Sequence, residues 1–167
     1  MTDTSPKPGA ANPSKTVAAI DIGANSIRMA LAEVLPEGRI EVFERLQRPV
    51  RLGQDTFRRG RLGASSMRAA MAVLRDYRQL LDLYKADQVR AVATSSVREA
   101  SNADNFLNRA YMATGLNIEV IATSEESRLT VSAVRRAVGA SLGINQGEAL
   151  VVDVGGGSTL LTFLENG

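Results

Sequence analysis

Apolar and polar residues follow a strand-like pattern in the first third of the chain. Three apolar segments in series, residues 16–22, 28–35 and 39–47, are predicted to be consecutive β-strands. The Pro-Glu-Gly sequence at 36–38 is typical of a turn between the second and third of them. Residues 1–15 are rich in Pro, Ser, Thr, Lys and Ala without a periodic apolar pattern, so we expect a disordered tail there.

Helical and strand-like patterns alternate after the third strand. A long helix is predicted to begin at a cap formed by Ser65 or Ser66 and to run to about Lys85. Its apolar positions include Met67, Met71, Leu74, Leu81 and Leu83. Further helices are expected from Asn102 to a stop at Gly115, and over residues 125–140. Short strands are expected over residues 89–93, 118–122 and 150–154. Strands in series followed by alternating helix and strand indicate an α/β fold with a mixed sheet and flanking helices.

One sequence pattern occurs twice. Residues 20–26 read Ile-Asp-Ile-Gly-Ala-Asn-Ser, and residues 152–158 read Val-Asp-Val-Gly-Gly-Gly-Ser. Each copy is an apolar strand with a carboxylate near its end, followed by a small-residue turn that leaves backbone N–H groups free to bind phosphate oxygens. A single glycine-rich turn could serve hairpin geometry alone. Two copies instead favour two half-sites that face each other around a phosphate.

Composition excludes several kinds of chemistry. The 167 residues contain no His and no Cys, so Ser-His-Asp and Cys-His catalysis, thiolate or imidazole zinc sites and disulfides are all excluded. Chemistry must therefore use carboxylates, hydroxyls, Lys, Arg and backbone amides. No leader or membrane-spanning pattern is present in the sequence, and we expect a soluble cytoplasmic protein without a membrane partner.

Basic residues gather in one stretch of the chain. Six arginines lie between positions 45 and 61: Arg45, Arg48, Arg51, Arg58, Arg59 and Arg61. The formal net charge is only +2, so no specific nucleic-acid partner is expected. Either the stretch is a solvated surface loop or it forms an electrostatic track for a polyanion.

Five motifs in order resemble the exopolyphosphatase and guanosine pentaphosphate phosphohydrolase family, within the actin, sugar kinase and heat-shock ATPase superfamily. They are Asp-Ile-Gly-Ala-Asn-Ser at 21–26, Arg-Leu-Gly at 51–53, Ala-Thr-Ser-Ser-Val-Arg-Glu-Ala at 93–100, Ser-Glu-Glu-Ser-Arg-Leu at 124–129 and Asp-Val-Gly-Gly-Gly-Ser-Thr at 153–159. The resemblance implies a ribonuclease H-like (actin-like ATPase) fold. It implies a first domain over residues 16–146 and the opening hairpin of a second, similar domain over 147–167.

The resemblance also implies an activity, which is release of terminal orthophosphate from polyphosphate or guanosine pentaphosphate with Mg²⁺ or Mn²⁺. Glu126 would be the base that activates water, Asp153 would position that water or the metal, and Asp21 would be a second metal ligand. Phosphate would be bound by Asn25, Ser26, Arg98, Gly155, Gly156, Gly157 and Ser158.

Three of the four charged candidates also have a structural alternative. Thr123 and Glu126 have the spacing of a helix capping box. Arg98 could form an ordinary ion pair with Glu99 or Asp104, and Asp21 could bind backbone N–H groups at the strand end.

Four positions depart from the family pattern. Leu160 stands where family members usually have Glu, and milder changes occur at Ala24, Thr123 and Ser127. The Asn-Gly pair at 166–167 is a turn signal with no returning strand after it, so we expect the chain to be a fragment whose active site is half enclosed and which is inactive by itself. A homodimer is a further expectation for the complete protein.

Three functional hypotheses remain open at this point. The first is the phosphohydrolase, and the second is an ATP-binding phosphotransferase or ATPase of the same superfamily. The third is a non-catalytic polyphosphate or alarmone sensor, which Leu160 suggests because an apolar side chain adds no charge near a metal.

Overall fold

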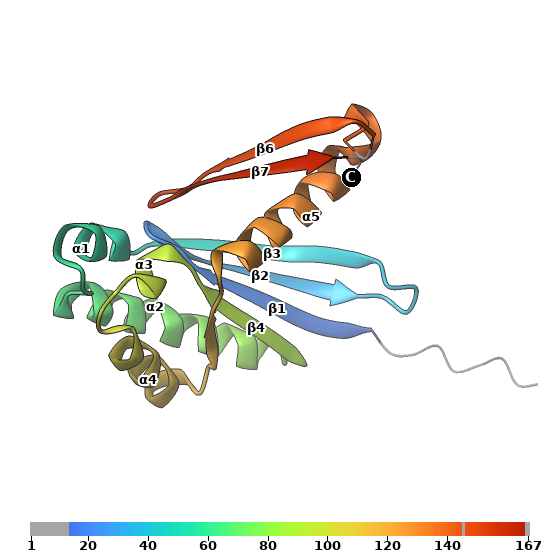
Figure 1. Ribbon diagram of the computed structural model, residues 1–167. Coiled ribbons are helices and arrows are strands. Elements are labelled where there is room, and N and C mark those ends of the chain that lie inside the picture. The colour runs from blue at the N-terminus through green and yellow to red at the C-terminus, as the bar shows by residue number, and fades with distance from the viewer. Residues whose placement is uncertain (1–13, 145, 166–167) are drawn as a thin grey trace, which may run out of the picture.

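The structure of this chain is a computed structural model that describes residues 14–144 and 146–165 (Figure 1). Of the tail expected over residues 1–15, residues 1–13 lie outside the described residues, as does the turn signal at 166–167. Strand β1 spans Lys15–Ile22, so it begins one residue earlier than expected. Within the described part of the chain, no helix combines the length and apolar character that crossing a bilayer requires.

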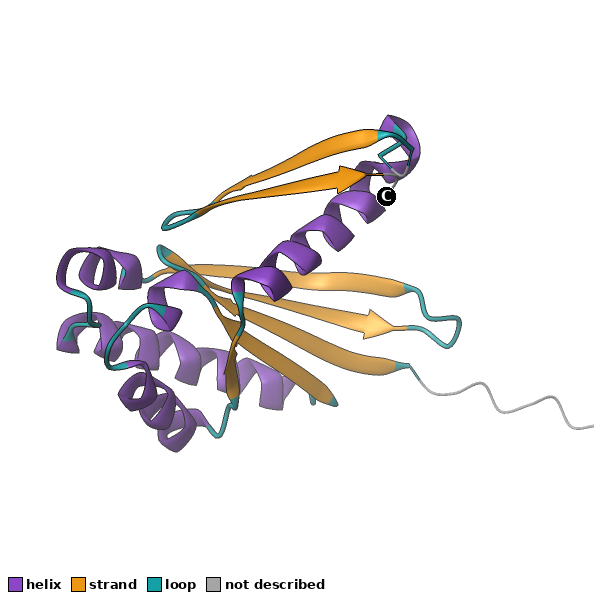
Figure 2. Ribbon diagram, in the orientation of Figure 1, coloured by secondary structure: helices purple, strands orange, loops and turns teal. Residues whose placement is uncertain are grey.

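Five strands form a mixed sheet in the order β3-β2-β1-β4-β5 (Figure 2). The strands that follow β1 are β2 (Ser26–Val34), β3 (Ile40–Pro49), β4 (Gln88–Ala93) and β5 (Ile118–Val120). The first three strands pair antiparallel as a meander, whereas β4 pairs parallel with both β1 and β5. The expected α/β class with a mixed sheet is confirmed, and the carboxyl ends of β1, β4 and β5 meet at one edge.

Four helices lie on one side of this sheet (Figure 1). They are α1 (Leu52–Arg59), α2 (Ala64–Leu83), α3 (Ser95–Arg98) and α4 (Ala103–Thr114). Apolar side chains between α2, α4 and the sheet are fully buried, among them Leu31, Leu74 and Phe106. The Tyr77 hydroxyl donates a 3.0 Å hydrogen bond to the Ile27 carbonyl, which joins α2 to β2.

Helix α5 (Thr123–Leu142) crosses the other side of the sheet and leads to a separate hairpin (Figure 1). The hairpin consists of β6 (Glu148–Val154) and β7 (Thr159–Glu165), which pair antiparallel as a two-stranded sheet. That this hairpin opens a second domain stays a prediction.

Local structure differs from the sequence expectations at further points. Helices α1 and α3 were not predicted, because each is a single short segment without a long apolar period. Helix α2 has Gly63 at its N-cap position, and no side chain caps it. The Ser66 hydroxyl instead donates to the Asp55 carboxylate, which also accepts the Gly63 N–H at 3.1 Å. Leu83 is 71% exposed at the end of α2 rather than in the core.

Candidate active site

The two copies of the repeated pattern fold into the same turn. In the first copy the Gly23 N–H donates to the Ser26 carbonyl at 3.1 Å, and in the second the Gly155 N–H donates to the Ser158 carbonyl at 2.8 Å. Each turn joins two antiparallel strands, β1 to β2 and β6 to β7. The sequence repeat is therefore also a repeat of backbone structure.

The two turns approach each other closely. A Cβ atom added at Gly156 would lie 2.3 Å from the Asn25 side-chain nitrogen. A Cβ atom added at Gly157 would lie 2.3 Å from a ring carbon of Phe57 and 3.0 Å from the Ala24 methyl group. These distances are shorter than van der Waals contact, so a side chain at either glycine would have to displace Asn25, Phe57 or Ala24.

Replacing Gly157 with alanine is expected to push the two turns apart. Overpacking of this kind costs about 1–3 kcal/mol. For the polyphosphate ligand that the family resemblance implies, we expect affinity to fall by about tenfold, since a tenfold change corresponds to about 1.4 kcal/mol. Isothermal titration calorimetry would measure the affinity. Gly139→Ala is the control, because a Cβ atom there would meet its nearest neighbour at 3.7 Å. Unchanged polyphosphate affinity in Gly157→Ala would contradict the prediction.

A cavity of ≈ 180 Å³ lies between the two turns and the adjoining strand and helix ends. Of the predicted site residues, all except Arg98 line it: Asp21, Asn25, Ser26, Glu126, Asp153, Gly155, Gly156, Gly157 and Ser158. Thr94 and Ser95 also line the cavity, at the end of β4 and the start of α3. Sequence reasoning quoted them within the 93–100 motif but gave them no role.

Glu126 lies in the first turn of α5, and Arg98 holds its carboxylate. The Arg98 guanidinium donates to the Glu126 carboxylate at 3.2 Å and to the Ile121 carbonyl at 2.9 Å. Both side chains are largely buried, at 17% exposure for Glu126 and 23% for Arg98. Arg98 therefore pairs with Glu126 rather than with either carboxylate that sequence reasoning considered.

The capping-box alternative for Glu126 is wrong. The N-cap residue of α5 is Ala122 rather than Thr123, and no side chain caps the helix. The Glu126 N–H donates to the Ala122 carbonyl at 3.0 Å, so it belongs to the regular hydrogen bonding of the helix. The carboxylate is therefore free of a capping role and faces the cavity.

Asp153 is held by a residue that sequence reasoning missed. The Thr130 hydroxyl on α5 donates a 3.0 Å hydrogen bond to the Asp153 carboxylate on β6. Thr130 comes one turn of helix after Glu126, and this spacing is the signal that could have found it. On the hairpin, Leu160 stands directly opposite Asp153 in the β6–β7 register.

The carboxyl of Asp21 has a raised pKa. Burial raises the pKa of its carboxyl, Arg28 at 3.7 Å opposes the rise, and the negative charges of Glu126 and Asp153 add to it. Among the described residues, no three acidic side chains group closely enough to form a metal cage of protein ligands alone. The donor set is carboxylate oxygen, which suits Mg²⁺ bound by one or two carboxylates together with substrate phosphates and water.

A raised pKa predicts how Asp21 affects stability without ligand. The native state binds the Asp21 proton more tightly than the unfolded state does. The protonated Asp21 carboxyl therefore stabilises the native state at pH values below the ordinary Asp pKa, and this stabilisation is lost as pH rises through the raised pKa. We therefore expect Asp21→Asn to be more stable than the unmodified chain at neutral pH and equally stable at about pH 3. Thermal unfolding of the two proteins at the two pH values, with chelator present, would measure these stabilities.

Asp87 offers a contrast for the same experiment. Its carboxylate accepts the Thr16 N–H at 2.8 Å, so Asp87→Asn is expected to lower stability at neutral pH. A loss of stability in Asp21→Asn similar to that in Asp87→Asn would overturn the electrostatic interpretation of Asp21.

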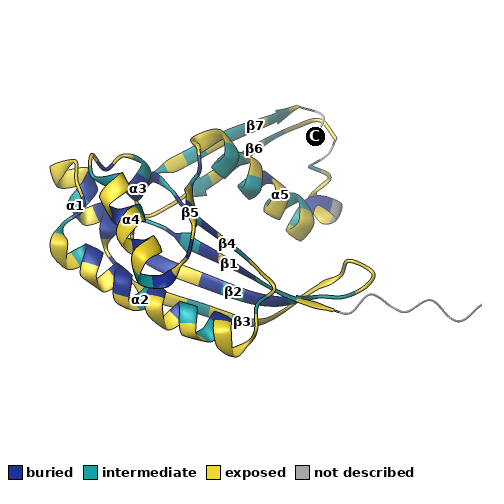
Figure 3. Ribbon diagram, turned by 90° about the horizontal axis from the view of Figure 1, so that it is seen from below, coloured by how far each residue is buried: buried dark blue, intermediate teal, exposed yellow. Residues whose placement is uncertain are grey.

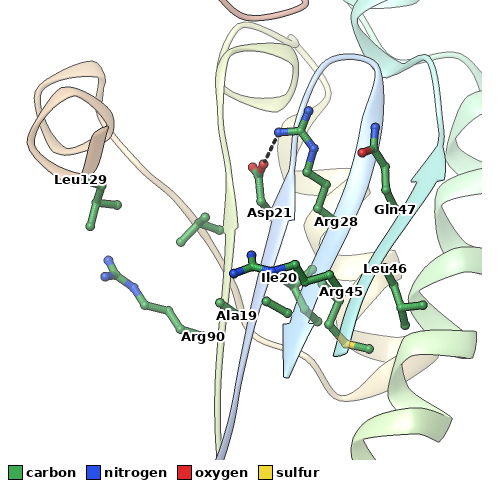
Figure 4. Close-up of a pocket in the computed structure, with 12 residues that line it drawn as sticks. Ala19, Ile20, Asp21, Arg28, Arg45, Leu46, Gln47, Arg90 and Leu129 are labelled. Carbon is green, nitrogen blue, oxygen red and sulfur yellow. Dashed lines mark ion pairs between the residues drawn. The ribbon is translucent and has the colours of Figure 1, made fainter. Parts of the chain in front are cut away.

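A second cavity of ≈ 530 Å³ adjoins the first and shares Asp21 and Arg28 with it (Figure 4). It lies on the sheet face that α5 crosses, where Leu129 of the helix faces the strands. Arg45 and Arg90 extend along its walls (Figure 4). The six arginines between positions 45 and 61 are all exposed, but they occupy β3, α1 and their connections rather than one loop.

Comparison with known proteins gives one consistent result. The sequence model of the Ppx/GppA phosphatase family matches residues 20–167. The chain is 39% identical over 158 residues to exopolyphosphatase 2 of Mycobacterium tuberculosis, a match that covers 90% of this chain and 48% of the relative.

Solved structures agree with this result. The crystal structure of the Aquifex aeolicus Ppx/GppA family member has a TM-score of 0.76 and 37% identity, covering 92% of this chain and 48% of that one. An exopolyphosphatase from Cytophaga hutchinsonii has a TM-score of 0.83 and 25% identity, covering 91% and 47%. The expected actin-like fold is therefore confirmed, and the chain spans about half the length of the relatives it matches. With the fold, the repeated turns and the family match in agreement, the chain belongs to the Ppx/GppA phosphatase family.

Proposed function

We propose that this chain acts in a phosphohydrolase that releases terminal orthophosphate from inorganic polyphosphate, with guanosine pentaphosphate as the alternative substrate. The observation that carries the proposal is the convergence on one cavity, whose wall includes Glu126, of two small-residue turns closed by the same backbone hydrogen bond. The names of the relatives support the same substrate class.

The terminal phosphoryl group is proposed to bind between the turns. Backbone N–H groups around Gly156 and Gly157, together with the Asn25 and Ser158 side chains, supply donors to its oxygens. These donors come from both hairpins, so the phosphoryl group would be held from two sides. Such positioning is the main requirement of phosphoryl transfer, because the transition state carries its charge on the equatorial oxygens.

Glu126 is proposed to accept a proton from the attacking water. The water oxygen forms a bond to the terminal phosphorus in line with the leaving oxygen, the phosphoanhydride bond breaks, and the electron pair leaves with the shortened polyphosphate. Arg98 fixes the Glu126 carboxylate through the 3.2 Å contact, so it acts here as a positioning residue. Direct phosphate contact by Arg98 stays a prediction.

The carboxylates of Asp21 and Asp153 are proposed to hold Mg²⁺, or Mn²⁺ in its place. When bound, the ion would neutralise charge on the phosphate oxygens. Thr130 would keep the Asp153 carboxylate in one orientation through its 3.0 Å hydrogen bond.

A non-catalytic binding protein is the second candidate function, and one observation favours it. Leu160 lies opposite Asp153 in the hairpin, where an apolar side chain contributes no ligand and no charge. A sensor of this kind would bind polyphosphate or guanosine pentaphosphate without releasing orthophosphate.

The proposal would be tested by measuring phosphate release by the protein expressed from the complete reading frame that encodes this chain. Polyphosphate, guanosine pentaphosphate and ATP would be compared with Mg²⁺, with Mn²⁺ and with chelator. Orthophosphate release from either of the first two, dependent on the ion, supports the hydrolase. Binding of either without release supports the sensor, and turnover of ATP alone would overturn both in favour of an ATPase.

A further inference from the structure

A groove of ≈ 550 Å³ runs between α2 and α4, on the side of the sheet away from α5. Three methionines line it: Met67 and Met71 from α2, and Met112 from α4. Met67 and Met71 are each 7% exposed and form the floor, whereas Met112 is 83% exposed at the rim. Methionine side chains are flexible and polarizable, so a surface built from them adapts to apolar groups of different shape.

Three arginines surround the same groove, namely Arg68, Arg75 and Arg109. All three are exposed. Figure 3 shows α2 and α4, the helices that carry them, side by side. No acidic residue occurs three or four positions from any of them on its own helix. None takes part in an ion pair among residues 14–144 and 146–165, although Arg78 on the same helix pairs with Asp82.

The groove therefore combines an apolar floor with a rim of uncompensated positive charge. The arginines at 68 and 75 are seven residues apart on α2, a distance of about 10 Å along the helix axis. A bound helix places residues at i, i+4 and i+7 on one face over a similar distance. Polyphosphate or another simple polyanion would match the charge but would leave the exposed Met112 side chain without an apolar contact.

We propose that the α2–α4 groove is a docking site for an amphipathic helix of a partner protein, with apolar side chains on the methionines and acidic side chains opposite the arginines. This surface is separate from the candidate active site, and the proposal does not depend on the proposed function. Its partner is defined by chemistry as an acidic amphipathic segment.

Methionine methyl groups provide a direct measurement, because the chain has five methionines and three of them line the groove. The chain would be labelled at the methionine methyl carbons and titrated with a helical peptide that carries Leu at i, i+4 and i+7 and Glu beside them. We expect the Met67, Met71 and Met112 signals to shift. The Met29 signal, from a buried residue of β2, is expected to stay unchanged.

Charge is tested with matched variants and a matched peptide. Arg109→Glu is expected to weaken binding of the acidic peptide about tenfold, whereas Arg136→Glu, the same charge change on α5, is expected to have little effect. An unchanged Met29 signal would show that each variant is folded. A peptide with Lys in place of Glu is expected not to bind.

Three outcomes would overturn the proposal. The first is that the signals of the groove methionines do not shift. The second is that the Lys peptide binds as tightly as the Glu peptide. The third is that polyphosphate displaces the acidic peptide from the Arg136→Glu variant but not from the Arg109→Glu variant. The last outcome would identify the groove as a polyanion site instead.

Discussion

Replacing Glu126 with glutamine is expected to lower the rate of phosphate release by about 10²- to 10⁴-fold, the usual contribution of a positioned general base. Glutamine has nearly the same shape and keeps an oxygen for the Arg98 guanidinium, but it cannot accept a proton from water. Turnover at saturating polyphosphate should therefore collapse while affinity stays within a few fold. Phosphate release and calorimetric binding, measured on the complete reading frame, would separate the two effects.

Glu125 is the matched control for this substitution. It is the adjacent carboxylate, and it pairs with Arg128 at 2.7 Å and with Arg90 at 3.5 Å. These contacts lower the pKa of Glu125 to about 2, with the hydrogen bond from Arg128 as the main cause. Glu125→Gln is expected to leave turnover nearly unchanged. Equal losses in the two variants would remove the argument that Glu126 is the base.

Replacing Phe106 with alanine is expected to lower the free energy of unfolding by about 3–5 kcal/mol, as for other large aromatic side chains removed from a core. Phe106 on α4 is fully buried in the apolar layer beneath the sheet. Removing the ring costs both its transfer free energy and the cavity left behind. Urea unfolding followed by circular dichroism would measure the change.

Phe163 provides the comparison for that prediction. It has the same side chain but is 61% exposed on the hairpin strand β7. We expect Phe163→Ala to change the free energy of unfolding by no more than about 0.5 kcal/mol, because exposed substitutions away from special features rarely cost more. A loss as large as that of Phe106→Ala would mean that the outer face of the hairpin is buried in solution.

Most elements of the fold could be predicted because the periodic spacing of their apolar residues extends over enough of the chain to be recognised. The helix expected over residues 125–140 is α5, and the strand expected over 89–93 is β4. The four-residue helix α3 gives no such period. The start of α2 was misplaced because Ser66 binds Asp55 of the unpredicted helix α1, a tertiary contact that no local pattern shows.

The candidate site also has features that the sequence predicted and features that it did not. The repeated sequence pattern identified the residues of both hairpin turns, since turns whose backbone N–H groups can bind an anion have a strong sequence signature. The contacts of Arg98 with Glu126 and of Thr130 with Asp153 could not be predicted, because each joins elements that are brought together only by the fold. Sequence therefore indicated which residues line the cavity, but not which neighbours orient them.

The two turns belong to separate sheets that α5 connects, so a phosphate group bound between them, as proposed, would cross-link the two sheets. A ligand that touches both turns ties the hairpin to the larger sheet at one end, while α5 already ties them at the other. The backbone amides of β6 and β7 should then exchange their hydrogens with solvent more slowly when polyphosphate is bound. Amides in the centre of the five-stranded sheet, already protected by its core, should change much less.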